Sequence, residues 1–266
     1  MVDTIYISTT TKSTTIKTYR KLLLSFVFIL TIFQNLAQAD SVNQFILPEY
    51  DTTQNSIKHQ AWGTYYVVHQ FESKGTINLL LGDNSPTGIY ADTCDFCMAS
   101  LEGTAIITTK NGEKIVLNYD RTDTTKGIDC RKCPLLKNTN VDTERLGKIR
   151  WKYSTGFGVG VNNLKLIPFR TIAVDKTFIP YGSVVFIPSI RGLHFTDEEN
   201  NERIHDGYFF AGDTGSAIQS NHLDFFIGTK KINPFKKVIT SNKNNLFDIY
   251  ICSNKEFVAK IKRYFE

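Results

Sequence analysis

The sequence predicts a mainly β protein, either a barrel or a sandwich. Short runs of β-branched and aromatic residues recur along the chain with Gly and Pro between them, which is the pattern of many short strands. Asn111-Gly112, between two such runs, is the strongest short-range signal for a hairpin. Helical periodicity is confined to one segment near 254–263, which we expect to form a C-terminal helix.

The individual strands follow from the same pattern. The first expected strand, at 62–68, reads Trp-Gly-Thr-Tyr-Tyr-Val-Val, and 104–109 and 114–118 flank the hairpin turn. Further strands are expected at 149–153, 170–174, 184–187, 208–211, 223–226 and 247–251.

The N-terminal 39 residues have the features of a secretory signal peptide. Basic residues precede an apolar run of 12 residues at 22–33, and Ala37-Gln38-Ala39 supplies a small-residue cleavage site. A membrane-spanning helix needs roughly 20 residues, so an uncleaved anchor is the less favoured alternative. Both interpretations place residues 40–266 outside the cytoplasm, in the periplasm, on the outer surface or in the medium.

The charge of the chain argues against a nucleic-acid partner. The formal charge is +5, and the leader carries four basic residues and one acidic residue, so the mature chain is left with 5 − 3 = +2. We therefore expect no charge-driven binding of nucleic acid. Along the mature chain we expect an approach segment with the first barrel strand at 40–71, a Cys-rich insertion or small second domain at 72–148, the barrel at 149–252 and the helix at 253–266.

Four of the five cysteines form two CxxC pairs in the insertion. This spacing suits a structural zinc site, whereas an exported protein favours disulfides between nearby cysteines. We prefer disulfides and keep structural zinc as the alternative; no other cofactor is expected. Cys252 is left over in an apolar strand and is expected to be a buried thiol. The paired cysteines are Cys94, Cys97, Cys130 and Cys133.

Three aspartates carry the functional argument. Asp175 ends an apolar strand, Asp213 starts an Asp-Thr-Gly turn, and Asp224 lies inside the run His-Leu-Asp-Phe-Phe. A carboxylate within a hydrophobic strand is costly unless it is paired or hydrogen-bonded. A single aspartate of this kind is usually a turn residue, because its side chain bonds to the nearby backbone. His205 and His222 lie near the aspartates in sequence but lack metal-ligand spacing, so no catalytic metal is expected.

The segment 170–228 resembles the 3D domain family, named for its three aspartates, and the related catalytic domain of membrane-bound lytic transglycosylase A. The resemblance rests on Ala-Val-Asp at 173–175, Ile-Pro-x-Gly at 179–182, Ala-x-Asp-Thr-Gly-x-Ala-Ile at 211–218 and Asp-x-Phe at 224–226. Ser216 and Gln219 depart from the family pattern, which has Gly and Lys there. We expect the first strand, at 62–66, to belong to the same domain.

The resemblance implies a six-stranded double-psi β-barrel that cleaves the β-1,4 bond between N-acetylmuramic acid and N-acetylglucosamine in peptidoglycan, with a 1,6-anhydro product. Carried over to this chain, it makes Asp224 the acid and base, with Asp213 and Asp175 orienting groups or tuning Asp224. Thr214, Gly215, Ser216 and Tyr66 are then expected to contact the substrate. A second hypothesis is an expansin-like double-psi barrel that binds cell-wall glycan without cutting it.

Overall fold

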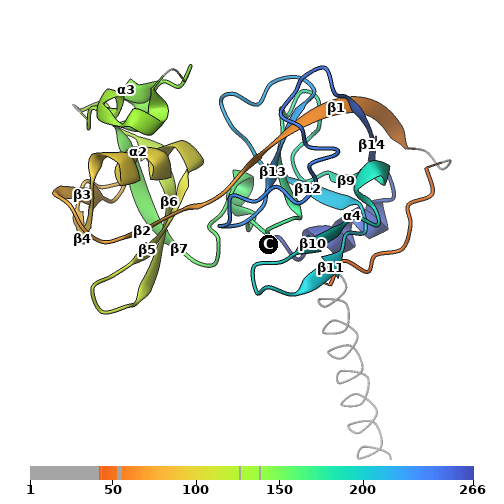
Figure 1. The fold of residues 1–266 in the computed structure, drawn as a ribbon, viewed down its shortest axis with the longest axis horizontal. Coiled ribbons are helices and arrows are strands. Elements are labelled where there is room, and N and C mark those ends of the chain that lie inside the picture. Colours follow the sequence, from red (N-terminus) through yellow and green to blue (C-terminus); the bar gives the residue numbers. More distant parts are fainter. Residues whose placement is uncertain (1–41, 43, 53–55, 126, 138) are drawn as a thin grey trace, which may run out of the picture. The chain divides into compact units, whose positions relative to one another are not determined.

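The computed structural model describes residues 42, 44–52, 56–125, 127–137 and 139–266 (Figure 1). The expected signal peptide lies outside the described residues. The chain divides into two compact units, residues 1–46 and residues 47–266, and the strands found among the described residues all belong to the second. Within the described part of the chain, no helix has the length and apolar character needed to cross a membrane.

Six strands close into a barrel, which confirms the predicted mainly β fold with a six-stranded double-psi barrel. Their order around the barrel is β1-β13-β8-β12-β9-β14, and the pairs β1/β13 and β8/β12 are parallel whereas the other pairs are antiparallel. The barrel strands are β1 (Ile57–Tyr66), β8 (Thr171–Ala173), β9 (Val184–Phe186), β12 (Tyr208–Asp213), β13 (His222–Phe226) and β14 (Phe247–Ile251).

The barrel strands read as apolar runs because most of their side chains are buried. Phe209 and Phe225 pack edge to face with their ring centroids 4.9 Å apart, an arrangement that aromatic pairs prefer. Gly63 in β1 faces the Phe225 ring, and a Cβ there would lie 2.8 Å from the ring. The glycine therefore lets β1 approach β13 closely enough to pair with it in parallel.

Residues 69–154 form a second group of elements, which we call the disulfide-bonded lobe. A four-stranded sheet has the order β2-β5-β6-β7, a separate hairpin is made of β3 and β4, and the helix α2 packs against the sheet. The strand at 149–154, which the sequence grouped with the barrel, pairs with β6 in this sheet. The elements are β2 (His69–Glu72), β3 (Ile77–Leu80), β4 (Pro86–Ala91), α2 (Thr93–Glu102), β5 (Thr104–Thr108), β6 (Lys114–Thr122), the 3-10 turns Cys130–Lys132 and Pro134–Leu136, α3 (Thr143–Leu146) and β7 (Ile149–Ser154).

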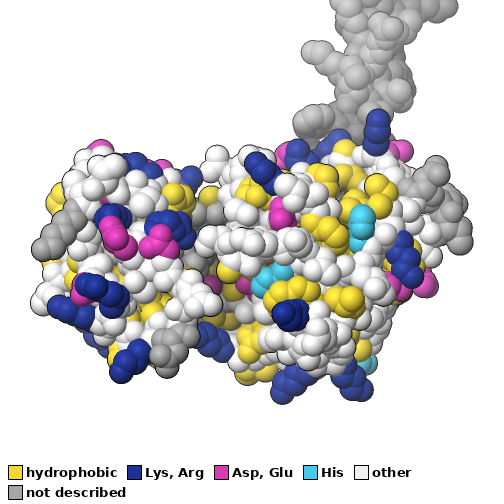
Figure 2. Space-filling model, turned by 90° about the horizontal axis from the view of Figure 1, so that it is seen from above, with side chains coloured by type: hydrophobic (Ala, Val, Ile, Leu, Met, Phe, Trp, Pro, Cys, Tyr) yellow, Lys and Arg dark blue, Asp and Glu magenta, His cyan; other side chains and the backbone are white. Residues whose placement is uncertain are grey.

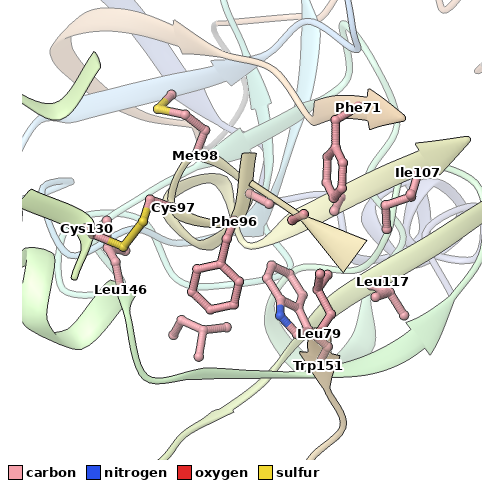
Figure 3. Close-up of a cluster of buried hydrophobic side chains, with 14 of the residues drawn as sticks. Phe71, Leu79, Phe96, Cys97, Met98, Ile107, Leu117, Cys130, Leu146 and Trp151 are labelled. Atoms are coloured by element: carbon pink, nitrogen blue, oxygen red, sulfur yellow. A yellow bond between two sulfur atoms is a disulfide. The ribbon is translucent and has the colours of Figure 1, made fainter. Parts of the chain in front are cut away.

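The disulfide-bonded lobe has its own hydrophobic core (Figure 3). Trp151 is fully buried and meets Phe96 of α2 edge to face at 6.3 Å. Two disulfides, Cys94–Cys133 and Cys97–Cys130, join α2 to the segment around the 3-10 turns. Of the two alternatives for the CxxC pairs, the structure therefore has the disulfides, cross-paired between the motifs.

The remaining elements lie around the barrel. A hairpin of β10 (His194–Thr196) and β11 (Glu202–Ile204) lies between Asp175 and Asp213 in the sequence. The last helix, α4 (Lys255–Lys262), begins at Asn254, whose side chain accepts a hydrogen bond from the amide of Phe257. Cys252 is buried and unbonded to another cysteine. Acidic and basic side chains are interspersed on the face shown in Figure 2 rather than gathered by sign.

Candidate active site

The barrel brings two of the three predicted aspartates to the two sides of one strand. Ala173 of β8 is in register with Asp224 on the antiparallel strand β13 and with Asp213 on the parallel strand β12. Adjacent strands lie about 4.8 Å apart, so the two aspartate backbones are separated by about two strand spacings. A register shift between Ala211 and Asp213 marks an irregularity in β12 next to the site.

Asp224 is held by a residue of β1. Thr64 pairs with Asp224 in the parallel register, and the Thr64 hydroxyl donates a hydrogen bond of 2.6 Å to Oδ1 of Asp224. Burial raises the pKa of the Asp224 carboxyl to about 6; the Thr64 hydrogen bond lowers it and the charge of Asp213 adds to the increase. About a tenth of this carboxyl therefore keeps its proton at pH 7, far more than for an ordinary aspartate.

Asp213 is held by a second residue of the same strand. Thr64 and Tyr66 project from the same face of β1, two residues apart, and the Tyr66 hydroxyl donates a hydrogen bond of 2.6 Å to Oδ2 of Asp213. Burial raises the pKa of Asp213 to about 6, against the hydrogen bonds from Tyr66 and the backbone amide of Thr214. The predicted substrate residue Tyr66 is thus in contact with the predicted aspartate.

The backbone of the segment after β7 packs closely against Asp213. A Cβ on Gly160 would lie 2.3 Å from the Gly212 carbonyl oxygen and 2.8 Å from Oδ1 of Asp213, so only glycine fits. The backbone of the preceding residue, Val159, makes two hydrogen bonds to the buried side chain of Asn118 in β6. That side chain accepts a hydrogen bond from the Val159 amide and donates one to the Val159 carbonyl. The disulfide-bonded lobe and the barrel therefore meet at Asp213.

Asp175 has different surroundings from the other two aspartates. Its carboxylate accepts hydrogen bonds from the amide and hydroxyl of Thr177 and from the amide of Ser220. These bonds lower the pKa of Asp175, so it is ionised at neutral pH. These hydrogen bonds tie the turn of Asp175 to the loop that precedes β13, and none of them reaches the other two aspartates.

The remaining predicted substrate residues line the loop after β12. Thr214 accepts a hydrogen bond of 2.9 Å from the Tyr181 hydroxyl, and its side chain and that of Ser216 are exposed. Gly215 starts a turn in which the amide of Ile218 bonds to its carbonyl. Exposed hydroxyls and a tight turn beside the two raised carboxyls are groups that can hold a sugar.

One carboxyl near the site was not expected from the sequence. Glu102 is the last residue of α2, and burial followed by repulsion from Asp224 raises its pKa to about 8, with Asp213 adding to the effect and Lys231 opposing it. A negative charge at a helix C-terminus is unfavourable to begin with. The only signal in the sequence was an acidic residue directly before the glycine that ends a helix, which is too common to interpret.

The arrangement suits proton transfer by a carboxylic acid. Two partly buried carboxyls with raised pKa values face groups of β1, and general acid catalysis is most effective when the pKa is near the working pH. Among the described residues, no group of three or more His, Cys, Asp or Glu side chains is placed to hold a metal ion.

Residues 170–233 match the 3D domain family, which confirms the resemblance predicted from the sequence. The chain is also similar in structure to solved lytic transglycosylases at low sequence identity. E. coli MltA with bound chitohexaose is 15% identical, with a TM-score of 0.47 over 72% of this chain and 71% of that chain. A membrane-bound lytic murein transglycosylase from Agrobacterium tumefaciens is 14% identical, with a TM-score of 0.48 over 92% and 94%. The lytic transglycosylase LtgG of Burkholderia pseudomallei is 14% identical, with a TM-score of 0.36 over 82% and 83%. No curated protein sequence matches the chain.

Proposed function

We propose that the protein is a lytic transglycosylase that cleaves the β-1,4 bond between N-acetylmuramic acid and N-acetylglucosamine in peptidoglycan. The observation that carries the proposal is the Asp224 carboxyl, partly buried in an apolar strand and bonded to Thr64, with a pKa raised to about 6. The match of residues 170–233 to the 3D domain supports the same assignment.

In the proposed reaction Asp224 acts first as an acid and then as a base. Its second oxygen, Oδ2, donates a proton to the glycosidic oxygen while the bond from that oxygen to the anomeric carbon breaks. The 6-hydroxyl of the same muramic acid attacks the anomeric carbon and gives its proton to Asp224, which restores the acid. Ordinary glycoside hydrolysis needs a second carboxylate to activate water or to act as nucleophile, whereas here the sugar supplies the nucleophile.

Asp213 and Tyr66 complete the proposed site. The carboxyl of Asp213 lies on the other side of β8 from Asp224, where it disfavours a second negative charge and so helps Asp224 to keep its proton. We assign substrate contact to Thr214, Gly215 and Ser216 in the exposed loop. Asp175 is assigned the separate task of fixing that loop through the Ser220 amide.

Export of the protein belongs to the same proposal. Two disulfides in one lobe are typical of proteins that fold in an oxidising compartment, and peptidoglycan lies outside the cytoplasm. The expected signal peptide would deliver the chain there.

Digestion of peptidoglycan sacculi with the purified protein tests the proposal. Mass spectrometry should find soluble muropeptides that end in 1,6-anhydro-N-acetylmuramic acid. These products should vanish in Asp224→Asn, because the amide keeps the acceptor for Thr64 but has no proton of suitable acidity to donate. Lys237→Gln, an exposed change outside the proposed site, is the matched control and should leave the products unchanged.

A second candidate function is the binding of cell-wall glycan without cleavage. It is favoured by Ser216 and Gln219, which stand in exposed positions where the family pattern has Gly and Lys. Sedimentation of the protein with sacculi, or binding of chitohexaose, without release of any muropeptide would support this function instead. Products with reducing ends would indicate a hydrolase.

A further inference from the structure

The Asp224 carboxyl is one end of a series of hydrogen bonds that passes through Thr64 to His222. Oγ1 of Thr64 lies 2.6 Å from Oδ1 of Asp224 and 2.8 Å from Nε2 of His222. The other ring nitrogen of His222, Nδ1, lies 3.4 Å from the carbonyl oxygen of Ala217. The indole of Trp62 stacks on the imidazole at 3.7 Å with an interplanar angle of 6°. The proposed mechanism leaves this buried histidine without a task.

The imidazole of His222 is buried, and its strand places it on the same side as Asp224. Only 8% of the surface of His222 is exposed, and the residue belongs to the same strand as Asp224, two positions earlier. Residues two apart project to the same side of a strand, so both side chains face Thr64 on the adjacent strand. The threonine hydroxyl therefore bridges an acid and a base that belong to one strand.

The number of protons available decides which group donates in each hydrogen bond between Asp224, Thr64 and His222. A neutral imidazole has one N–H, and a carbonyl oxygen can only accept, so a neutral ring that bonds to Ala217 carries its proton on Nδ1 and accepts at Nε2. The Thr64 hydroxyl has a single proton. When it donates that proton to Nε2, Thr64 must accept from Asp224, which requires the carboxyl to be protonated on Oδ1.

We propose that Thr64 and His222 form a proton relay that shares one proton between Asp224 and the imidazole. In one state Asp224 is a neutral acid and His222 is neutral. In the other, the proton on Oδ1 has moved to Oγ1 of Thr64 while the Thr64 proton has moved to Nε2, which leaves a carboxylate and an imidazolium. Each state contains the same number of protons, and the bond from Nδ1 to Ala217 persists in both.

The relay gives His222 a positioning role for the acid, and this role rests on the proposed function. Donation from Oδ2 uses a second proton, taken up from solvent: the reacting form has one proton on Oδ2 and the relay proton on the imidazole, with Thr64 donating to Oδ1. When the Oδ2 proton passes to the leaving oxygen, the pair is left as a carboxylate and an imidazolium, so the carboxyl is not an isolated buried charge. The proton of the attacking hydroxyl then returns to Oδ2 and restores the reacting form. His222 touches no substrate in this scheme and acts only through Thr64.

The surroundings favour the neutral state at rest. Near Asp224, the carboxyls of Asp213 in β12 and Glu102 in α2 oppose a negative charge on Asp224. The Tyr66 hydroxyl of β1 bonds to Asp213 and not to Asp224. On the side of His222, burial lowers the pKa of the ring, against the bond to Ala217. Both shifts place the shared proton on Asp224 rather than on the imidazole.

Nitrogen-15 NMR of the full chain tests the relay without any measurement of activity. The chain has five histidines, and loss of a signal in His222→Phe assigns the resonance. The relay requires the neutral ring to carry its proton on Nδ1, which the two nitrogen shifts report directly. A neutral His222 with its proton on Nε2 would overturn the proposal, because Nε2 could then not receive the proton from Thr64.

The same spectra measure the coupling to Asp224. The two hydrogen bonds place Nε2 and Oδ1 no more than about 5.4 Å apart, a distance at which opposite charges shift a titration by about two pH units at an effective dielectric constant of about 20. Asp224→Asn should therefore lower the titration of His222 by one to two units, and the change should shrink in the Thr64→Val background. No change on Asp224→Asn would contradict the relay.

Enzyme kinetics on sacculi then separates a relay from a merely structural role. Thr64→Val and His222→Phe should lower the rate about 10- to 100-fold and move the pH–rate profile, whereas Thr64→Ser should restore both. His222→Phe keeps an aromatic ring for Trp62 to stack on, and His194→Gln on the exposed hairpin is the control. A lower rate with an unmoved profile would contradict the relay. If the protein cleaves no glycan, the NMR result still decides whether the relay exists, so failure of the proposed function is distinguishable.

Discussion

Replacing Asp224 with Asn should stabilise the protein, and the gain should depend on pH. The folded structure raises the pKa of Asp224 from 3.8 to about 6, which means that it disfavours the charged form. Each pKa unit corresponds to about 1.4 kcal/mol, so the ionised carboxyl costs about 3 kcal/mol of stability above pH 6. Below about pH 3 the carboxyl is protonated in both the folded and the unfolded chain, and the cost disappears. The asparagine has no charge at any pH and still accepts the Thr64 hydrogen bond.

Thermal unfolding of Asp224→Asn and the wild type between pH 4 and pH 8 measures this effect. For a chain of this size, about 3 kcal/mol corresponds to a rise in Tm of about 6 to 12 °C at pH 7.5, falling towards zero at pH 4. Asp175→Asn is the matched control with the opposite sign. The pKa of Asp175 is lowered by its hydrogen bonds, so its carboxylate stabilises the fold at neutral pH and its loss should lower Tm. Equal Tm values for Asp224→Asn and the wild type at pH 7.5 would refute the reasoning.

Three further predictions address the parts around the site. Gly160→Ala should lower activity at least tenfold and cost about 1 to 3 kcal/mol, measured by sacculus digestion and denaturation, because its Cβ would overlap the groups around Asp213. Replacing both Cys97 and Cys130 with Ser should cost about 2 to 3 kcal/mol in denaturant, since this disulfide lies inside the loop already closed by Cys94–Cys133. Glu102→Gln should raise Tm increasingly as the pH rises from 4.5 to 8, because the folded chain raises the pKa of this carboxyl to about 8.

The predictions for Gly160 and Glu102 each have a clear contrary result. Gly112→Ala forces a side chain into the left-handed turn between β5 and β6, which contributes no group to the proposed site, so it should lose stability but keep its activity per folded molecule. Equal activity loss in Gly112→Ala and Gly160→Ala would show that the glycines act only on stability. A Glu102→Gln variant whose Tm gain is the same at pH 5 and pH 8 would show that Glu102 lies in a solvated position.

The parts of the fold that the sequence predicted are those that local chemistry determines. The hairpin at Asn111-Gly112 forms because Gly112 adopts a positive φ of 79° and its amide bonds back to Thr109. The barrel strands were visible because they are buried and therefore read as apolar runs. The three aspartates were visible because a carboxylate beside such a run is unusual and coincides with a family motif.

The sequence could not reveal which side chains meet, because that depends on pairing between distant strands. Thr64 lies 160 residues from Asp224, and Tyr66 lies 147 residues from Asp213. The parallel pairing of β1 with β13 brings Thr64 to Asp224, and closure of the barrel brings Tyr66 to Asp213 on β12. No local pattern encodes a register over that separation. Glu102 was missed for the same reason. Asp175, in contrast, bonds mainly to Thr177, which is the local turn bonding expected of a lone aspartate.

The central claim is that a muramyl hydroxyl, and not water, attacks the bond that Asp224 protonates. Digestion of sacculi in water enriched in oxygen-18, followed by mass spectrometry of the new chain ends, tests it most directly. The account predicts anhydro ends that contain no oxygen-18, because the attacking oxygen comes from the sugar itself. Oxygen-18 at the new anomeric carbon, or the absence of any new ends, would contradict it.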